Sequence, residues 1–278
     1  MAPVSSHQPV NLKEELRMKM NKKLWMIFAV VCTLAMLAAV AAPARAQDEP
    51  KEKPPMYTYV GFWNIPRPQW ADMEKNNAAD QKILDKAIAD GSIVGYGNDL
   101  NLVHQADGIT HDDWWSAMSM AALMNTLDKF YKAGTPTSPV LASATKHSDD
   151  IFMSRYYNWR AGSYKGAYTR VASFKLKPEA PANAVENLSK TVFVPLLEKL
   201  LADGTIVEYE IDTETVHTVD PGNFWIEFIA PNADGLDKFD AALRGANKSN
   251  PMLGPGFASL VDFGVHRDYL SSTTATYK

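Results

Sequence analysis

Apolar residues follow two different spacings along this chain. Between residues 223 and 229, Phe224, Ile226 and Phe228 occupy alternate positions, which is the period of a half-buried strand. Between residues 182 and 203, leucines and valines recur at steps of three and four residues, which places them on one face of a helix. The chain therefore predicts a mixture of strands and amphipathic helices.

The same order of elements, βαββαβ, is predicted in both halves of the chain. The first half has predicted strands at 57–65, 92–104, 114–120 and 151–158, with helices at 70–90 and 123–132. The second half has predicted strands at 168–176, 205–218, 223–229 and 257–269, with helices at 182–203 and 233–246. This order is typical of the ferredoxin-like unit.

An internal sequence repeat supports the division of the chain into two equivalent halves. Residues 83–96 and 196–209 are identical at eight of fourteen positions, and both contain the sequence Ala-Asp-Gly followed by Ile-Val. The same offset relates His104 to His217. We therefore predict an α+β protein of two tandem ferredoxin-like units, 57–160 and 166–271, followed by a tail at 272–278. Their sheets should pack face to face, because each sheet has helices on only one side.

The first 46 residues have the pattern of a signal peptide. A basic stretch at 20–23 precedes an apolar run at 24–42 and the Ala44-Arg45-Ala46 motif. We expect translation to start at Met18 or Met20 and cleavage between Ala46 and Gln47, which would deliver the protein to the periplasm or outside the cell. The alternative is a membrane anchor, since nineteen apolar residues can span a bilayer. Residues 47–56, rich in Lys, Glu and Pro, are predicted to form a disordered leader.

Removal of this segment would change the composition. The remaining chain has 22 basic and 30 acidic residues, which argues against nucleic acids and anionic membranes as partners. Cys32 is the only cysteine and would leave with the signal peptide, so no disulfide or cysteine metal site is expected. Common phosphate-binding, dinucleotide-binding and hydrolase motifs are absent.

Two tandem βαββαβ units resemble the dimeric α+β-barrel superfamily. The superfamily includes antibiotic-biosynthesis-type monooxygenases, EthD-like proteins and chlorite-dismutase-like haem proteins. The resemblance covers nearly all of the chain after residue 46, and it rests on element order and duplication. It implies a barrel made within one chain, and it implies the fold more directly than the activity.

Candidate ligand-binding residues lie on the second, third and last predicted strands. Arg and Tyr two positions apart on a strand share a face and could hold an anionic or phenolic ligand. The second copy offers His217, Arg267, Tyr269 and Trp225, and the first copy offers His104, Arg155 and Tyr157. The alternative is structural: histidines that cap strands, arginine stems that cover apolar surface, and aromatic residues that pack between sheets.

A weaker candidate is the segment His111-Asp112-Asp113, predicted to be a loop. Imidazole and carboxylates bind divalent metals, but three adjacent residues rarely reach one ion, so the two aspartates are expected to stabilise a turn. No metal site is predicted.

Three functions remain open at this stage. The first is an exported α+β barrel that binds a small apolar or aromatic molecule, with oxygenase-like chemistry and no cofactor. The second is a non-enzymatic assembly module, with a homo-oligomer as the expected partner. The third is a haem protein of the chlorite-dismutase kind, for which His217 or His104 would be the ligand. The sequence leaves the cofactor unknown.

Overall fold

The computed structural model describes residues 51–278, except residues 105, 107, 217, 219 and 220. These residues belong to one compact unit, which extends from Pro50 to Lys278. The predicted signal peptide, its cleavage site and the start of the leader lie outside the described residues. Within the described part, no helix is long and apolar enough to cross a membrane.

Each half of this unit contains the predicted βαββαβ order. The first half consists of β1 (Met56–Asn64), α2 (Trp70–Asp90), β2 (Gly95–Asn101), β3 (His111–Ala117), α3 (Met120–Ala133), α4 (Pro139–Ala142) and β4 (Lys146–Trp159), with short 3-10 turns η1 (Arg67–Gln69) and η2 (Thr135–Thr137). The second half consists of β5 (Gly162–Lys175), α5 (Ala184–Leu188), the π-helical η3 (Ser189–Phe193), α6 (Val194–Asp203), β6 (Glu208–Glu214), β7 (Asn223–Ala230), α7 (Ala233–Ser249), α8 (Leu253–Leu260) and β8 (Arg267–Tyr277).

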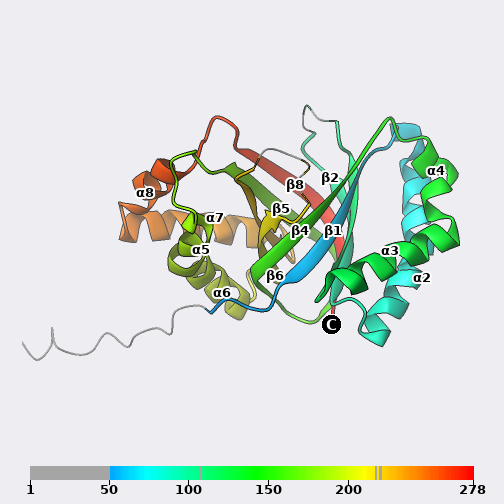
Figure 1. Ribbon diagram of the computed structural model, residues 1–278, viewed down its shortest axis with the longest axis horizontal. Helices are drawn as coiled ribbons and strands as arrows, with labels where there is room; N and C mark the ends of the chain where they lie inside the picture. The colour runs from blue at the N-terminus through cyan, green and yellow to red at the C-terminus, as the bar shows by residue number, and fades with distance from the viewer. Residues whose placement is uncertain (1–50, 105, 107, 217, 219–220) are drawn as a thin grey trace, which may run out of the picture. The chain divides into compact units, whose positions relative to one another are not determined.

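The eight strands form one closed antiparallel barrel in the order β1-β3-β2-β8-β5-β7-β6-β4. Each half contributes four neighbouring strands, and the pairs β2–β8 and β4–β6 join the two sheets. The helices of the first half cover one side of the barrel and those of the second half cover the other (Figure 1). The predicted fold, two ferredoxin-like units that form an α+β barrel within one chain, is confirmed. Closure of the sheet leaves no unpaired strand edge.

Alternate residues of each strand pack against the helices. In the first half, Tyr96 of β2 and Trp115 of β3 lie in a buried cluster with Leu123 and Phe130 of α3. In the second half, a larger cluster joins β6 and β7 to the helices, with Phe224 as one of its fully buried members. The apolar periodicities of strands and helices therefore meet at two cores outside the barrel wall.

The opposite face of each strand points into the barrel. Trp114 and Tyr277 lie in a third buried cluster there, with ring centroids 5.6 Å apart. They lie so close to β2 that a Cβ atom on Gly97 would stand 2.5 Å from Trp114, and one on Gly95 would stand 2.6 Å from Tyr277. Glycine at both positions is therefore required by the aromatic side chains that cover the strand.

Three boundaries differ from the sequence-based expectation. His111-Asp112-Asp113 is not a loop but the start of β3, where its backbone pairs with both β1 and β2. The first part of the expected strand 257–269 is helical, because Phe257 and Leu260 pack against the second core from α8. The expected tail at 272–278 is wrong, since β8 continues to Tyr277 and buries alternate residues inside the barrel.

The described end of the expected leader also has defined contacts. Lys53 donates its backbone N–H to the carbonyl of Arg155, and its ammonium group donates to the carbonyl of Tyr157. Met56 is fully buried at the start of β1. Residues 53–56 therefore pack along β4, because pairing with this strand satisfies their backbone groups.

Candidate functional site

A pocket lies on the helix-facing side of the first sheet, lined by residues of β1–β4 and of the helical segments that cover them. Its cavity volume is about 70 Å³, and the empty space including the open mouth is about 620 Å³. Aromatic and aliphatic side chains form much of its wall, among them Tyr59, Trp115, Leu84 and Phe130. The enclosed part is the size of one small ring, and a larger ligand would extend through the mouth.

Asp113 is a carboxyl residue of the pocket whose pKa is strongly raised. It lies on β3 beside Trp115 and accepts a hydrogen bond of 2.7 Å from Asn98 Nδ2. Burial raises the pKa of Asp113 to about 7; the hydrogen bond from Asn98 opposes this shift, and the negative charges of Asp80 and Asp99 add to it. A carboxyl group with a pKa near 7 can both take up and return a proton at neutral pH.

A second carboxyl group, Asp80 of α2, also lines the pocket. It accepts hydrogen bonds of 2.8 Å from Thr135 and from Asn76. Burial raises the pKa of Asp80, although both hydrogen bonds lower it. The two side-chain donors hold Asp80 in place, whereas Asp113 has one side-chain donor.

The mouth of the pocket carries a chain of three polar side chains. His147 stacks on Trp63 with ring centroids 3.6 Å apart, and its Nδ1 lies 3.1 Å from the carbonyl of Phe62. Its Nε2 lies 3.3 Å from Asp149 Oδ1, which also accepts a 2.5 Å hydrogen bond from the Tyr59 hydroxyl. Both ring nitrogens of His147 therefore lie close to acceptor atoms. Burial and the contact with Asp149 raise the pKa of Tyr59, so Tyr59 acts as a hydrogen-bond donor.

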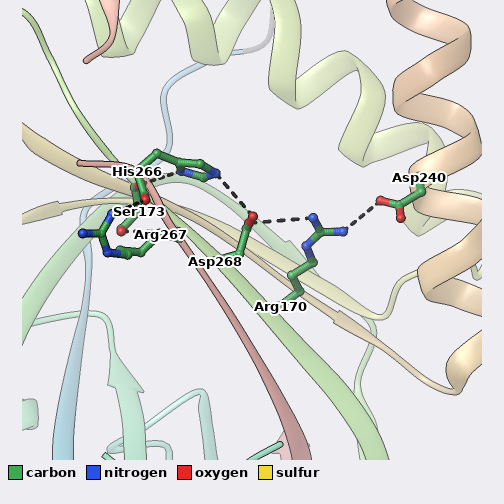
Figure 2. A network of polar contacts seen from close by, with 6 residues as sticks. All are labelled: Arg170, Ser173, Asp240, His266, Arg267 and Asp268. Atoms are coloured by element: carbon green, nitrogen blue, oxygen red, sulfur yellow. Dashed lines mark hydrogen bonds and ion pairs between the residues drawn. The ribbon is translucent and has the colours of Figure 1, made fainter. Parts of the chain in front are cut away.

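The second half contains the same arrangement (Figure 2). His266 stacks on Phe174 with centroids 4.4 Å apart, and its Nδ1 lies 2.8 Å from the carbonyl of Ser173. Its Nε2 lies 3.3 Å from Asp268 Oδ2. Each half thus positions a His-x-Asp pair at the start of its last strand, with the histidine against an aromatic residue of its first strand.

The surroundings of the two pairs differ. Where the first half has the Tyr59 hydroxyl, the second half has Arg170, whose guanidinium lies 3.7 Å from Asp268 and 2.8 Å from Asp240 of α7. Figure 2 shows this chain from His266 to the helix. Phe257 also packs edge-on against Phe174, with centroids 5.1 Å apart. The second pair is therefore built into a packed network, while the first borders the pocket.

Sequence reasoning missed these histidines because the spacing between the halves is not constant. The repeat has an offset of 113 residues at His104 and His217, whereas His147 and His266 are 119 residues apart. Loops of different length before the last strand cause the difference. A comparison of the two last strands by motif, without a fixed offset, would have revealed the His-x-Asp pair.

The candidates of the second copy do not line the pocket. Arg267 is exposed and donates to the carbonyl of His266 at 2.7 Å. Tyr269 is partly exposed on β8, and Trp225 lies inside the barrel with its ring centroid 4.7 Å from that of Phe152. His217 lies outside the described residues, so the expected grouping around it stays a prediction.

The candidates of the first copy are separated from one another. A β-bulge between Ser154 and Tyr156 interrupts the alternation of β4. Arg155 is consequently exposed and pairs with Glu52 at 2.7 Å, whereas Tyr157 is buried and donates its hydroxyl to the carbonyl of Pro54. His104 is exposed, 6.3 Å from the ring of Trp70. The expectation that Arg155 and Tyr157 share one ligand-binding face is wrong because of the bulge.

Asp112 points to the opposite side of β3 from His111 and Asp113. Burial lowers the pKa of His111 to about 4, and its Nδ1 lies 2.9 Å from the hydroxyl of Thr110. Asp112 and Asp113 are neighbours on a strand and therefore lie on opposite faces. Among the described residues, no group of three His, Cys, Asp or Glu side chains could hold a metal ion.

Comparison with known proteins gives structural neighbours only. No family model and no curated protein matches the sequence. A "putative monooxygenase" from Lactobacillus acidophilus NCFM superposes with a TM-score of 0.60 at 12% identity, over 81% of this chain and 97% of that one. A second protein of that description, from Fusobacterium nucleatum, gives a TM-score of 0.55 at 9% identity, over 81% and 95%. The chain therefore has the fold of the dimeric α+β-barrel proteins.

Proposed function

We propose that the pocket of the first half binds a small planar aromatic molecule and that Asp113 exchanges a proton with an acidic group on it. The observation that carries this proposal is a carboxyl group with a pKa near 7 in the wall of an aromatic pocket. The rings of Tyr59 and Trp115 stack 4.3 Å apart along the same wall. A phenol matches this wall, because its ring is apolar and its hydroxyl can donate to Asp113.

Oxygenase-type chemistry is the more specific form of the proposal. Two proteins with this fold carry monooxygenase names. In this scheme Asp113 removes a proton from an activated CH₂ group and leaves a carbanion. The carbanion adds dioxygen, and a proton from Asp113 gives a hydroperoxide. Loss of water then yields a ketone, so CH₂ and O₂ become C=O and H₂O. The apolar wall supports this scheme because it limits competing water.

A haem group does not fit the described residues. His147 is the histidine in the pocket wall, but its two nitrogens lie 3.1 and 3.3 Å from the acceptors Phe62 O and Asp149, so neither is free to ligate iron. His104 is exposed and follows the end of β2, and His217 lies outside the described residues.

The ligand proposal predicts a preference for phenols. Wild-type protein should bind 4-nitrophenol at least about tenfold more tightly than nitrobenzene, since a hydrogen bond to a charged group contributes roughly 1.5–3 kcal/mol. Quenching of tryptophan fluorescence measures both affinities, because Trp63 and Trp115 line the pocket. Asp113→Asn should abolish the preference while nitrobenzene still binds.

The control for this experiment is Asp128→Asn, which removes the same charge from an exposed position of α3 outside the pocket. This variant should keep the wild-type preference. Failure of both probes to bind the wild type, or a preference that survives in Asp113→Asn, would contradict the proposal. Oxygen uptake with activated CH₂ compounds then tests the oxygenase step separately, with one O₂ consumed for each ketone formed.

Export is proposed from the sequence pattern of residues 20–46. Protein recovered from the periplasm or the medium should begin at Gln47, as measured by intact mass and N-terminal peptide mapping. A chain that retains residues 24–42 in the membrane fraction would instead show that the segment is an anchor.

A homo-oligomer also stays a prediction, and it would have to use surfaces other than strand edges, because the barrel closes within one chain.

A further inference from the structure

Six carboxylate side chains occupy the inward face of the barrel strands. They are Asp99 of β2, Asp112 of β3, Glu208, Glu210 and Asp212 of β6, and Glu227 of β7. The alternation of the strands places them there, since Tyr209 and Ile211, the intervening residues of β6, lie in the outer core. In the described part of the chain, no Lys or Arg forms an ion pair with any of the six.

The carboxylates face one another across paired strands. Asp99 is directly opposite Asp112, and Glu210 is directly opposite Glu227. Like charges at such positions repel each other. Burial raises the pKa of all six. The charges of neighbouring carboxylates raise it further for every member except Asp99, whose hydrogen bonds oppose the effect of burial, so part of the cluster is protonated and neutral in the absence of a cation.

Hydrogen bonds from the protein do not satisfy every carboxyl group of this cluster, and Glu208 is the clearest case. Its side chain has no solvent exposure, and neither carboxylate oxygen has a hydrogen-bond partner. Glu210, by contrast, accepts a hydrogen bond of 3.2 Å from Thr58, and Asp99 accepts one of 3.3 Å from Thr169. A buried acceptor without a donor is costly, and a cationic donor would relieve that cost.

We propose that the interior of the barrel binds a linear organic diamine or polyamine. The carboxylates are spread over four strands instead of converging, and no three of them could hold a metal ion. Along β6 they recur at every second residue, a spacing of roughly 6.7 Å, which suits charges carried at intervals on an alkyl chain. Trp114 and Tyr277, which lie inside the barrel, offer ring faces to the alkyl chain and its ammonium groups.

The exposure of the inward-facing residues indicates the direction of entry. Asp112, Trp225 and Glu227 keep intermediate exposure, whereas Glu208 and Tyr277 are buried. An amine would therefore enter past Asp112 and Glu227 and reach Glu208 last. This site is separate from the outer pocket, because Asp113 and Asp112 lie on opposite faces of β3.

Isothermal titration calorimetry of the full-length protein with spermidine and with putrescine tests the proposal. Titrations with CaCl₂ and with NaCl serve as the comparison with inorganic cations. We expect saturable, one-site binding of spermidine that is tighter than that of putrescine and that releases protons. The number of protons released, obtained from two buffers with different ionisation heats, should be larger at pH 6 than at pH 8. No amine binding, or saturable binding of Ca²⁺ in its place, would overturn the proposal.

Two variants locate the binding site. Glu208→Gln together with Glu210→Gln should weaken spermidine binding at least about tenfold, as should Asp112→Asn near the entrance. Asp237→Asn, which removes one exposed charge on α7, should bind like the wild type. The amide variants keep the side-chain shape and lose no ion pair, and a far-UV spectrum verifies that they are folded. Equal affinity of the wild type and both interior variants would place the amine elsewhere and overturn the proposal.

Discussion

Raising the pH from about 4 to 7 is expected to lower the free energy of unfolding by several kcal/mol. Buried Asp99 and partly buried Asp113 have pKa values of about 6 and about 7 in the folded protein, both above the usual value of an aspartate. In this window the folded state binds more protons than the unfolded state, so stability is greatest below the unfolded pKa and falls as the pH rises through the folded pKa. Asp113 alone contributes on the order of 4 kcal/mol, at about 1.4 kcal/mol for each pH unit.

Urea unfolding at pH 4.5, 6 and 7.5 in amine-free buffer measures this effect. Asp99→Asn combined with Asp113→Asn should make the profile shallower, because an amide does not titrate, while the other five interior carboxyl groups still do. The exposed Asp128→Asn should leave it unchanged. A free energy of unfolding that stays constant or rises between pH 4.5 and 7.5 in the wild type would show that these carboxyl groups do not hold protons in the folded barrel.

Gly97→Val is expected to destabilise the protein by on the order of 3 kcal/mol. The new Cβ would stand 2.5 Å from the ring of Trp114, which is buried and lies against Tyr277. Overpacking of this kind costs roughly 1–3 kcal/mol or more. Combining Gly97→Val with Trp114→Leu should recover part of the loss, because the smaller side chain removes the clash.

The matched control is Gly245→Ala in α7, where an added Cβ meets nothing within 4 Å. There the substitution should stabilise the protein by roughly 0.5–1 kcal/mol, since alanine restricts the unfolded chain and favours the helix. Thermal and urea unfolding of the wild type and the three variants give the comparison. A Gly97→Val variant as stable as the wild type would mean that Trp114 does not cover β2 as described.

The hydrophobic spacing of the sequence predicted the architecture, because local periodicity decides both the element type and the buried face. The helix at 70–90 matches α2 at both ends. The last strand was misplaced: it was expected at 257–269, but Leu253–Leu260 is helical, and β8 runs from Arg267 to Tyr277. Ser271 and Thr273 of β8 are buried, and the strand continues through residues 272–277, which had been expected to form a tail.

The candidate site depended on contacts that periodicity does not encode. β3 starts at His111, three residues earlier than expected. Asp113 therefore lies in the pocket wall instead of in a turn. The sequence Glu208-Tyr209-Glu210-Ile211-Asp212 is typical of a strand with one face in water. Only closure of the barrel, by pairing of strands far apart in the chain, places those acids inside.

The pairing of β2 with β8 also constrains when the barrel can be completed. Asn98 of β2 and Thr273 of β8 are hydrogen-bonded across a separation of 175 residues. Synthesis therefore completes β2 long before its partner β8. Until the second half has been made, the four-stranded sheet of the first half has two unpaired edges. Contacts of such long range make folding slow, and the exposed edge of β2 in that interval is the place where two nascent chains would exchange strands.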